Sequence, residues 1–323
     1  MVNILRKNLP ILIFIILIFI PCHIHAKEWS SVESEHFVVM YSESRKKALE
    51  IQKIAEDFYP KVTENLGYST PRKIAIWFFE SRKNFHMTAR APIQDWAAGY
   101  AYPLHARIAI KDPSSLENRR INLTHLLKHE ITHVIFGLYM GDNLEKVPTW
   151  FNEGIAMYGA DEWSYGEYWT ILMGTLSDSI IPLKEISYTF PRGESKARLA
   201  YAQSSSVINF IVERYGHPAL RECIRLMASG YSFNRAMNIS MGISVDWLEH
   251  TWLNSIKKRY KWISILSSWV IFWTLVILIA VIAYLRRKAR NRRILKEWEE
   301  EEELWWPIDV SEGYEDKTDQ WHY

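Results

Sequence analysis

Two histidines and a glutamate within five residues are the first feature of this sequence that can do chemistry. The run is His129-Glu130-Ile131-Thr132-His133, and the apolar residues around it predict a helix over residues 121–138. Residues at i and i+4 lie on one face of a helix, so both imidazoles can reach one metal ion. The carboxylate of Glu130 then lies beside the metal without binding it, where it can accept a proton from a water.

A third ligand is needed, because two helical histidines leave a tetrahedral zinc short of one protein ligand and one water. The candidate is Glu153, in the run Trp-Phe-Asn-Glu-Gly-Ile-Ala at residues 150–156. A Gly-Asp-Asn turn at residues 141–143 separates this second predicted helix, 149–160, from the first. We therefore expect the second helix to return across the first, with Glu153 facing the histidines.

Both motifs have a plainer interpretation. A helix with three turn-spaced histidines, His125 together with the two of the motif, can simply face solvent. Glu153 can equally be an ordinary exposed helical glutamate. The occurrence of the two motifs together favours the zinc site.

HEITH followed by WFNEGIA resembles the gluzincin metallopeptidases, and is most similar to the short MA-like peptidase domains of exported bacterial proteins. The resemblance covers about residues 28–256. It implies one Zn²⁺ per chain, with His129, His133 and Glu153 as ligands and Glu130 as the catalytic base. It also implies a peptide or protein substrate.

The resemblance further implies a tyrosine that stabilises the oxyanion of the reaction. Tyr201, which opens the helical run Tyr-Ala-Gln-Ser, is the first candidate, ahead of Tyr158 and Tyr165. The Gly-x-Met-Glu-Asn element with which related aminopeptidases hold a free amine has no counterpart, because residues 97–101 contain no carboxylate. We therefore expect an endopeptidase or processing enzyme, with residues 107–111 as an edge strand for the substrate.

Composition excludes other classes of protein. The chain has 323 residues, and its 39 Lys and Arg against 37 Asp and Glu give a formal charge of only +2. Such a balance argues against a nucleic-acid partner. The two cysteines, Cys22 and Cys223, provide neither a disulfide framework nor an all-cysteine metal site.

Two apolar runs predict a membrane topology. Residues 1–26 have the basic start and apolar stretch of a secretory signal peptide, with an uncleaved N-terminal anchor as the alternative. Residues 263–285 carry no charge and predict a single transmembrane helix. More basic residues follow this run than precede it, which predicts a cytoplasmic C-terminus. The expected location is the cell membrane, with residues 27–262 as an extracytoplasmic domain and 286–323 as a tail.

That tail is basic at first and then acidic and rich in tryptophan. It can be a docking segment for a cytoplasmic partner, or a solvated extension that merely follows the anchor.

The order of the remaining patterns predicts an α+β fold. β-rich runs at residues 36–41 and 73–80 and a hairpin over 99–111 predict an N-terminal mixed sheet with helices. A helical zincin subdomain follows, and then the transmembrane helix. The helices of the zincin subdomain are predicted at 121–138, 149–160, 200–215, 217–229, 232–238 and 244–261.

The function predicted from these patterns is a membrane-anchored zinc metallopeptidase acting outside the cytoplasm. The alternative is a catalytically inactive zincin-like domain, tethered to the membrane for binding or signalling. The presence of Glu130 favours the hypothesis of an active enzyme, because a catalytically inactive site needs no general base.

Overall fold

The computed structural model describes residues 29–80, 85, 98–115, 121–160, 165–266 and 269–305. Two compact units make up the chain, the first ending at Ile256 and the second beginning at Lys257. The signal peptide predicted for residues 1–26 lies outside the described residues. The tryptophan-rich end of the tail, residues 306–323, lies outside them as well.

Unit 1 begins with a five-stranded mixed sheet in the order β1-β2-β3-β5-β4. The three inner strands are parallel, and the outer strands β1 and β4 pair antiparallel to their neighbours. The N-terminal mixed sheet of the predicted α+β fold is therefore confirmed. The strands are β1 (Ser30–Glu33), β2 (Phe37–Tyr41), β3 (Ile74–Phe79), β4 (Gly99–Tyr102) and β5 (Arg107–Lys111).

The predicted hairpin over residues 99–111 is present as β4 and β5, but the expected edge strand is wrong. Residues 107–111 form β5, which pairs with β3 on one side and with β4 on the other. The side chains of Ile108 and Ile110 are fully buried, as befits an inner strand. The outer strand next to β5 is β4.

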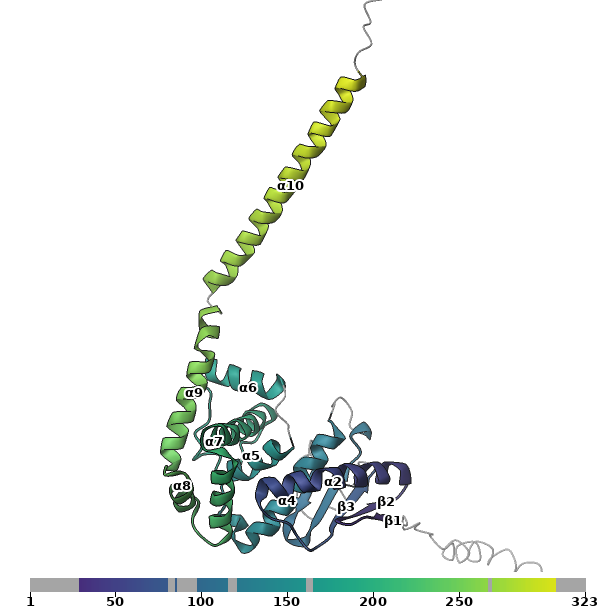
Figure 1. The fold of residues 1–323 in the computed structure, drawn as a ribbon, viewed down its shortest axis with the longest axis vertical. Coiled ribbons are helices and arrows are strands. Elements are labelled where there is room, and N and C mark those ends of the chain that lie inside the picture. The colour runs from purple at the N-terminus through teal and green to yellow at the C-terminus, as the bar shows by residue number, and fades with distance from the viewer. Residues whose placement is uncertain are drawn as a thin grey trace, which may run out of the picture. The chain divides into compact units, whose positions relative to one another are not determined.

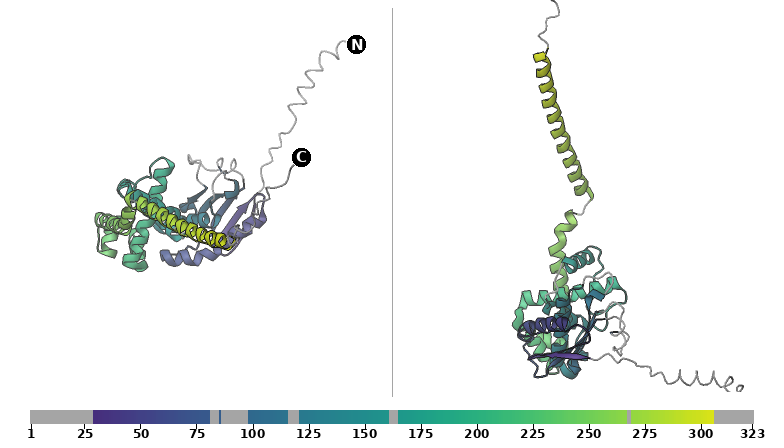
Figure 2. Two further views of the ribbon diagram at one scale, coloured as in Figure 1. Left: turned by 90° about the horizontal axis from the view of Figure 1, so that it is seen from above. Right: turned by 90° about the vertical axis from the view of Figure 1, so that its right-hand side faces the viewer.

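Apart from α2, which lies between β2 and β3 in sequence, the helices of unit 1 follow the sheet and form the second half of the unit. In Figure 1 and the left view of Figure 2, the strands and α2 lie on one side of the unit and α5 to α8 on the other. Among the described residues, the α-helices are α2 (Arg45–Leu66), α4 (Leu123–Met140), α5 (Thr149–Gly159), α6 (Tyr165–Leu176), α7 (Glu194–Ala228), α8 (Phe233–Met241), α9 (Val245–Leu266) and α10 (Trp269–Trp305), of which α10 belongs to unit 2, and the 3₁₀ helices are η1 (Pro103–His105), η2 (Pro113–Ser115) and η3 (Gly141–Lys146). α7 leaves helical geometry at Gly216, where the sequence predicts one helix to end and another to begin.

Local capping fixes the ends of α2, which packs on β1, β2 and α4. The hydroxyl of Ser44 accepts the backbone N–H of Lys47, and Gly67 closes the helix with a left-handed φ of 68°. Glu80, directly after β3, accepts the backbone N–H groups of Glu43 and Ser44 and the hydroxyl of Ser42. The start of α2 is thus fastened to the end of the central strand.

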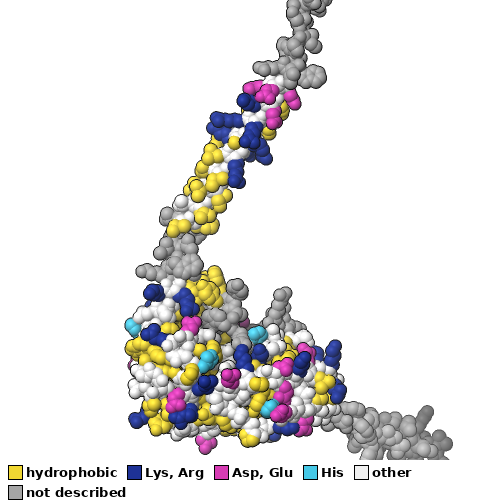
Figure 3. Space-filling model, in the orientation of Figure 1, with side chains coloured by type: hydrophobic (Ala, Val, Ile, Leu, Met, Phe, Trp, Pro, Cys, Tyr) yellow, Lys and Arg dark blue, Asp and Glu magenta, His cyan; other side chains and the backbone are white. Residues whose placement is uncertain are grey.

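The transmembrane helix predicted for residues 263–285 is wrong. The structure describes this run in α9, up to Leu266, and in α10, from Trp269 on, and residues 267–268 lie outside the described residues. Further along α10, hydrophobic side chains give way to a band of Lys and Arg and then to acidic side chains (Figure 3).

Within the part of the chain that the structure describes, no helix combines the length and the apolar character needed to cross a membrane. The predicted single-pass location in the cell membrane, with the peptidase outside and the C-terminus in the cytoplasm, depended on that helix. Because that helix is not found among the described residues, the predicted membrane location is wrong as well.

Candidate metal centre

The two helices that carry the motifs form as predicted. α4 is capped at its N-terminus by Asn122, whose side-chain oxygen accepts the backbone N–H groups of Thr124 and His125. The turn expected at residues 141–143 is the start of η3, and α5 follows Pro148. α4 and α5 pack against each other, so the short connection returns the chain across the histidine-bearing helix.

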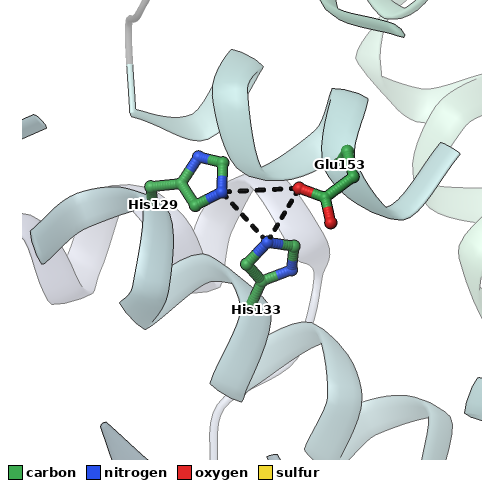
Figure 4. Close-up of side chains that lie close together, drawn as sticks. All are labelled: His129, His133 and Glu153. Carbon is green, nitrogen blue, oxygen red and sulfur yellow. Dashed lines mark hydrogen bonds and ion pairs between the residues drawn. The ribbon is translucent and has the colours of Figure 1, made fainter. Parts of the chain in front are cut away.

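His129, His133 and Glu153 come together between these helices (Figure 4). The Nε2 atoms of the two histidines are 3.1 Å apart, and Glu153 Oε2 lies 3.5 Å from His129 Nε2 and 3.3 Å from His133 Nε2. Ligand atoms bound at about 2.0–2.1 Å to one tetrahedral zinc lie about 3.3 Å from each other. The three side chains therefore have the chemistry and the spacing to hold such an ion.

The three side chains are largely but not fully enclosed. Their exposed fractions are 15% for His129, 11% for His133 and 19% for Glu153. Burial by itself raises the pKa of Glu153, but the charge of His133 and hydrogen bonds from both histidines outweigh it. The pKa of Glu153 is lowered well below its ordinary value, so the side chain is a carboxylate at neutral pH.

Asn152 was not assigned a role from the sequence, yet its side chain contacts the group. The Oδ1 atom of Asn152 lies 3.1 Å from Nδ1 of His133. If the Nδ1–H of His133 donates to this oxygen, the Nε2 lone pair faces the other two ligand atoms. Histidine ligands of metals usually donate their second ring N–H to such a partner. This tendency is the signal from which a polar neighbour of Glu153, such as Asn152, could have been predicted to orient a histidine.

Glu130 lies on the side of α4 that faces the sheet, and only 7% of it is exposed. A β-carbon added to Gly99, the first residue of β4, would lie 2.8 Å from Oε1 of Glu130 and 3.0 Å from its Cγ. The backbone of β4 therefore lies directly against the carboxylate. A side chain at position 99 would compete with Glu130 for the same space.

A second close approach fixes α5 on α7. A β-carbon added to Gly154 would lie 2.5 Å from the backbone oxygen of Ser204. Because Gly154 follows Glu153 directly, this contact sets how far the carboxylate extends from α7 toward α4.

Tyr201 lies on α7, one turn before Ser204. Its ring packs edge-on against Phe190, with 4.8 Å between the ring centroids, and it lines a cavity together with Met157. Met157 is four residues after Glu153 on α5, so this cavity has one wall residue on the same helix as Glu153.

The other candidates are placed differently. The hydroxyl of Tyr158 lies 3.0 Å from Nε2 of His217. His217 is not one of the two motif histidines. The side chain of Tyr165 lies outside the described residues. His125 is not among the three residues whose ligand atoms converge.

Several known proteins are similar to this chain in sequence or structure. The uncharacterized protein YhcO of Bacillus subtilis (strain 168) is 22% identical over 249 residues, which cover 73% of this chain and 72% of that protein. Solved structures that match this chain include a two-domain M1 zinc metallopeptidase bound to L-arginine, at 11% identity with a TM-score of 0.43. An M1 zinc metallopeptidase from Deinococcus radiodurans also matches at 11% identity, with a TM-score of 0.37.

These structural matches cover 70% of this chain but only about half of theirs, 51% in both cases. At such scores they carry no assignment of individual residues. The family comparison is of a different kind, because the model of the Peptidase MA superfamily matches residues 54–258, which include both motifs. This range is well over half of the chain, and the chain therefore belongs to the Peptidase MA superfamily.

Proposed function

We propose that this protein is a zinc-dependent metallopeptidase, and that His129, His133 and Glu153 hold the ion. The observation that carries the proposal is the convergence of their three ligand atoms within 4.8 Å of one another. Two imidazoles and one carboxylate are a ligand set found in catalytic zinc sites, which keep their fourth position for water or substrate. Membership in the Peptidase MA superfamily supports the same metal and the same reaction class.

Glu130 is the proposed general base. It is adjacent to His129 in sequence, and its carboxylate is not one of the converging ligand atoms. The backbone of β4 lies directly against it, on the side of α4 that faces the sheet. Zinc held by these three residues would act as a Lewis acid and would lower the pKa of a water to about 7. The Glu130 carboxylate would accept the proton from the attacking water and deliver it to the amine that leaves.

Tyr201 is the proposed donor to the oxygen that becomes negative as the peptide carbonyl is attacked. Its support is the resemblance of its sequence position to that of the family's tyrosine, and its place in a cavity whose wall includes Met157 of the Glu153-bearing helix. Asn152 would keep the ring of His133 in the orientation that presents Nε2 to the metal.

An endopeptidase is favoured over an aminopeptidase. An enzyme that removes N-terminal residues needs a carboxylate to hold the free amine of its substrate. The strand next to Glu130, β4, reads Gly-Tyr-Ala-Tyr and offers none. A peptide could instead extend along the outer strand in both directions from the site of cleavage.

The test compares the full chain with its Glu130→Gln variant. Both should bind about one zinc, measured by elemental analysis after desalting, because Glu130 is not a ligand. Cleavage of a mixture of synthetic peptides, followed by mass spectrometry, should fall by roughly 10²–10⁴-fold in the variant. Glu50→Gln, at an exposed glutamate on α2, is the matched control and should cleave normally. Equal cleavage by Glu130→Gln and the unmodified chain would contradict the enzyme assignment.

A further inference from the structure

A cavity whose lining includes Tyr201 and Met157 has other lining residues to which the mechanism above gives no role. It encloses about 180 Å³ between α5, α6 and α7. At about 30 Å³ for each water, this is the space of about six waters, or roughly one amino-acid side chain.

The cavity lies within reach of a residue next to the cleaved bond. Met157, in its wall, is four residues after Glu153 on α5, which places the two side chains about 6 Å apart along the same helix face. Successive residues of an extended peptide are about 3.3 Å apart. The side chain of a residue that flanks the cleaved bond can therefore enter the cavity.

The inner wall of the cavity is apolar. It is made by Met157, Ala197 and Ala202, which are 6%, 7% and 1% exposed, together with the ring of Tyr201. The small side chains of the two alanines leave the space open. Such a wall suits a chain of methylene groups rather than a short polar side chain.

The mouth of the cavity is charged and acidic on balance. Glu167 of α6 and Glu194 and Arg198 of α7 line it, so the formal charge of the lining is −1. An Arg198 Nη2–H donates to Oε1 of Glu194 at 2.8 Å, and both side chains of this pair are exposed. A negative mouth repels acidic side chains and attracts cationic ones.

We propose that this cavity receives the substrate side chain next to the cleaved bond, and that it selects lysine or arginine. The methylene stem lies against Met157 and the two alanines, and the cationic end remains at the mouth beside Glu167. This assignment rests on the proposed function, since only a metal at the three converging side chains makes the cavity a substrate pocket.

The proposed selection of lysine or arginine side chains can be tested by measuring the binding of zinc-directed ligands, without any peptide cleavage. Peptide hydroxamates that differ only in one side chain, lysine, norleucine or glutamate, are titrated calorimetrically into the zinc-loaded full chain. Norleucine has the same four-carbon stem as lysine but no charge. The expected order of affinity is lysine, then norleucine about two- to fivefold weaker, as for exposed charge pairs, and then glutamate at least about tenfold weaker than lysine.

Two isosteric variants test which charge produces the preference for lysine over norleucine. Glu167→Gln should remove most of the preference for lysine over norleucine, because it makes the lining formally neutral. Glu185→Gln, at an exposed glutamate outside the cavity, makes the same change in total charge and should leave the preference unchanged. Zinc content is measured in each variant, so that a lost metal is not mistaken for a changed pocket.

The outcomes separate the pocket from the enzyme. Equal affinity for the three hydroxamates, or tightest binding of norleucine, would overturn the assignment of the cavity and leave the zinc peptidase standing. Failure of every hydroxamate to bind the zinc-loaded chain would overturn both. A preference for lysine that survives in Glu167→Gln but is lost in Glu185→Gln would also overturn the assignment.

Discussion

Gly99 lies against the carboxylate of Glu130, at a distance where a β-carbon on residue 99 would be 2.8 Å from the Oε1 atom. The contact joins the first residue of β4 to the proposed general base on α4. Since the obstructed atom is the end of a flexible side chain, an added methyl group would displace Glu130 more readily than it would displace the strand.

Gly99→Ala is therefore expected to reduce peptide cleavage by roughly tenfold to a hundredfold, as a misplacement of about 1 Å can do. Zinc content should stay at about one per chain, because none of the proposed ligands is moved directly. The measurement is kcat on a peptide identified as a substrate of the unmodified chain, with elemental analysis on the same preparation. Unchanged kcat would show that Glu130 tolerates the extra methyl group where it lies.

Asn152→Ala and Glu153→Gln should weaken zinc binding to different degrees. Loss of the oxygen next to His133 Nδ1 removes a partner that orients the ring, which typically costs about 10–100-fold in metal affinity. Replacement of the Glu153 carboxylate removes a charged ligand and should cost more. Competition with a chromogenic chelator gives both constants, and a smaller effect at Glu153 than at Asn152 would remove Glu153 from the ligand set.

Gly154→Ala should destabilise the fold as well as the site. The added β-carbon would lie 2.5 Å from a backbone oxygen of α7, which cannot rotate away as a side chain can. Overpacking of this kind typically costs about 1–3 kcal/mol. We expect a lower midpoint of urea unfolding and a weaker affinity for zinc in the same variant. A normal midpoint would mean that α5 and α7 can separate without strain.

Glu80 should make stability depend on pH in the acid range. Burial raises the pKa of Glu80, but hydrogen bonds from the Ser42 hydroxyl and the backbone of Ser44 outweigh it and leave the pKa below its ordinary value of 4.5. A carboxyl with a lowered pKa in the folded state stabilises the fold fully above its unfolded pKa, and loses this contribution as pH falls through the folded value.

Urea unfolding between pH 7 and pH 3 checks this sign. The free energy of unfolding should fall as pH drops below about 4.5, and Glu80→Gln should flatten that part of the profile. Glu50→Gln, at an exposed position of α2, serves as the control. A profile of Glu80→Gln that is parallel to that of the unmodified chain would rule out Glu80 as a source of the dependence.

Much of the candidate site was visible in the sequence, because it depends on the helical period. The i, i+4 spacing of His129 and His133 places both rings on one face of any helix that forms there. The following turn, and the run that contains Glu153, predicted the return of a second helix to that face. The same local reasoning predicted the hairpin of β4 and β5 and the mixed sheet.

Other features were decided only by the tertiary structure. Whether β5 or β4 lies on the outside, which backbone lies against Glu130, and which side chain contacts His133 Nδ1 depend on the packing of segments far apart in sequence. The uncharged run at residues 263–285 also shows the limit, because composition predicted a transmembrane helix there, whereas no helix of the described residues combines the length and the apolar character to span a membrane. A periodic pattern specifies which face of an element is apolar, whereas strand order, helix ends and inter-helix distances result from contacts that no single segment encodes.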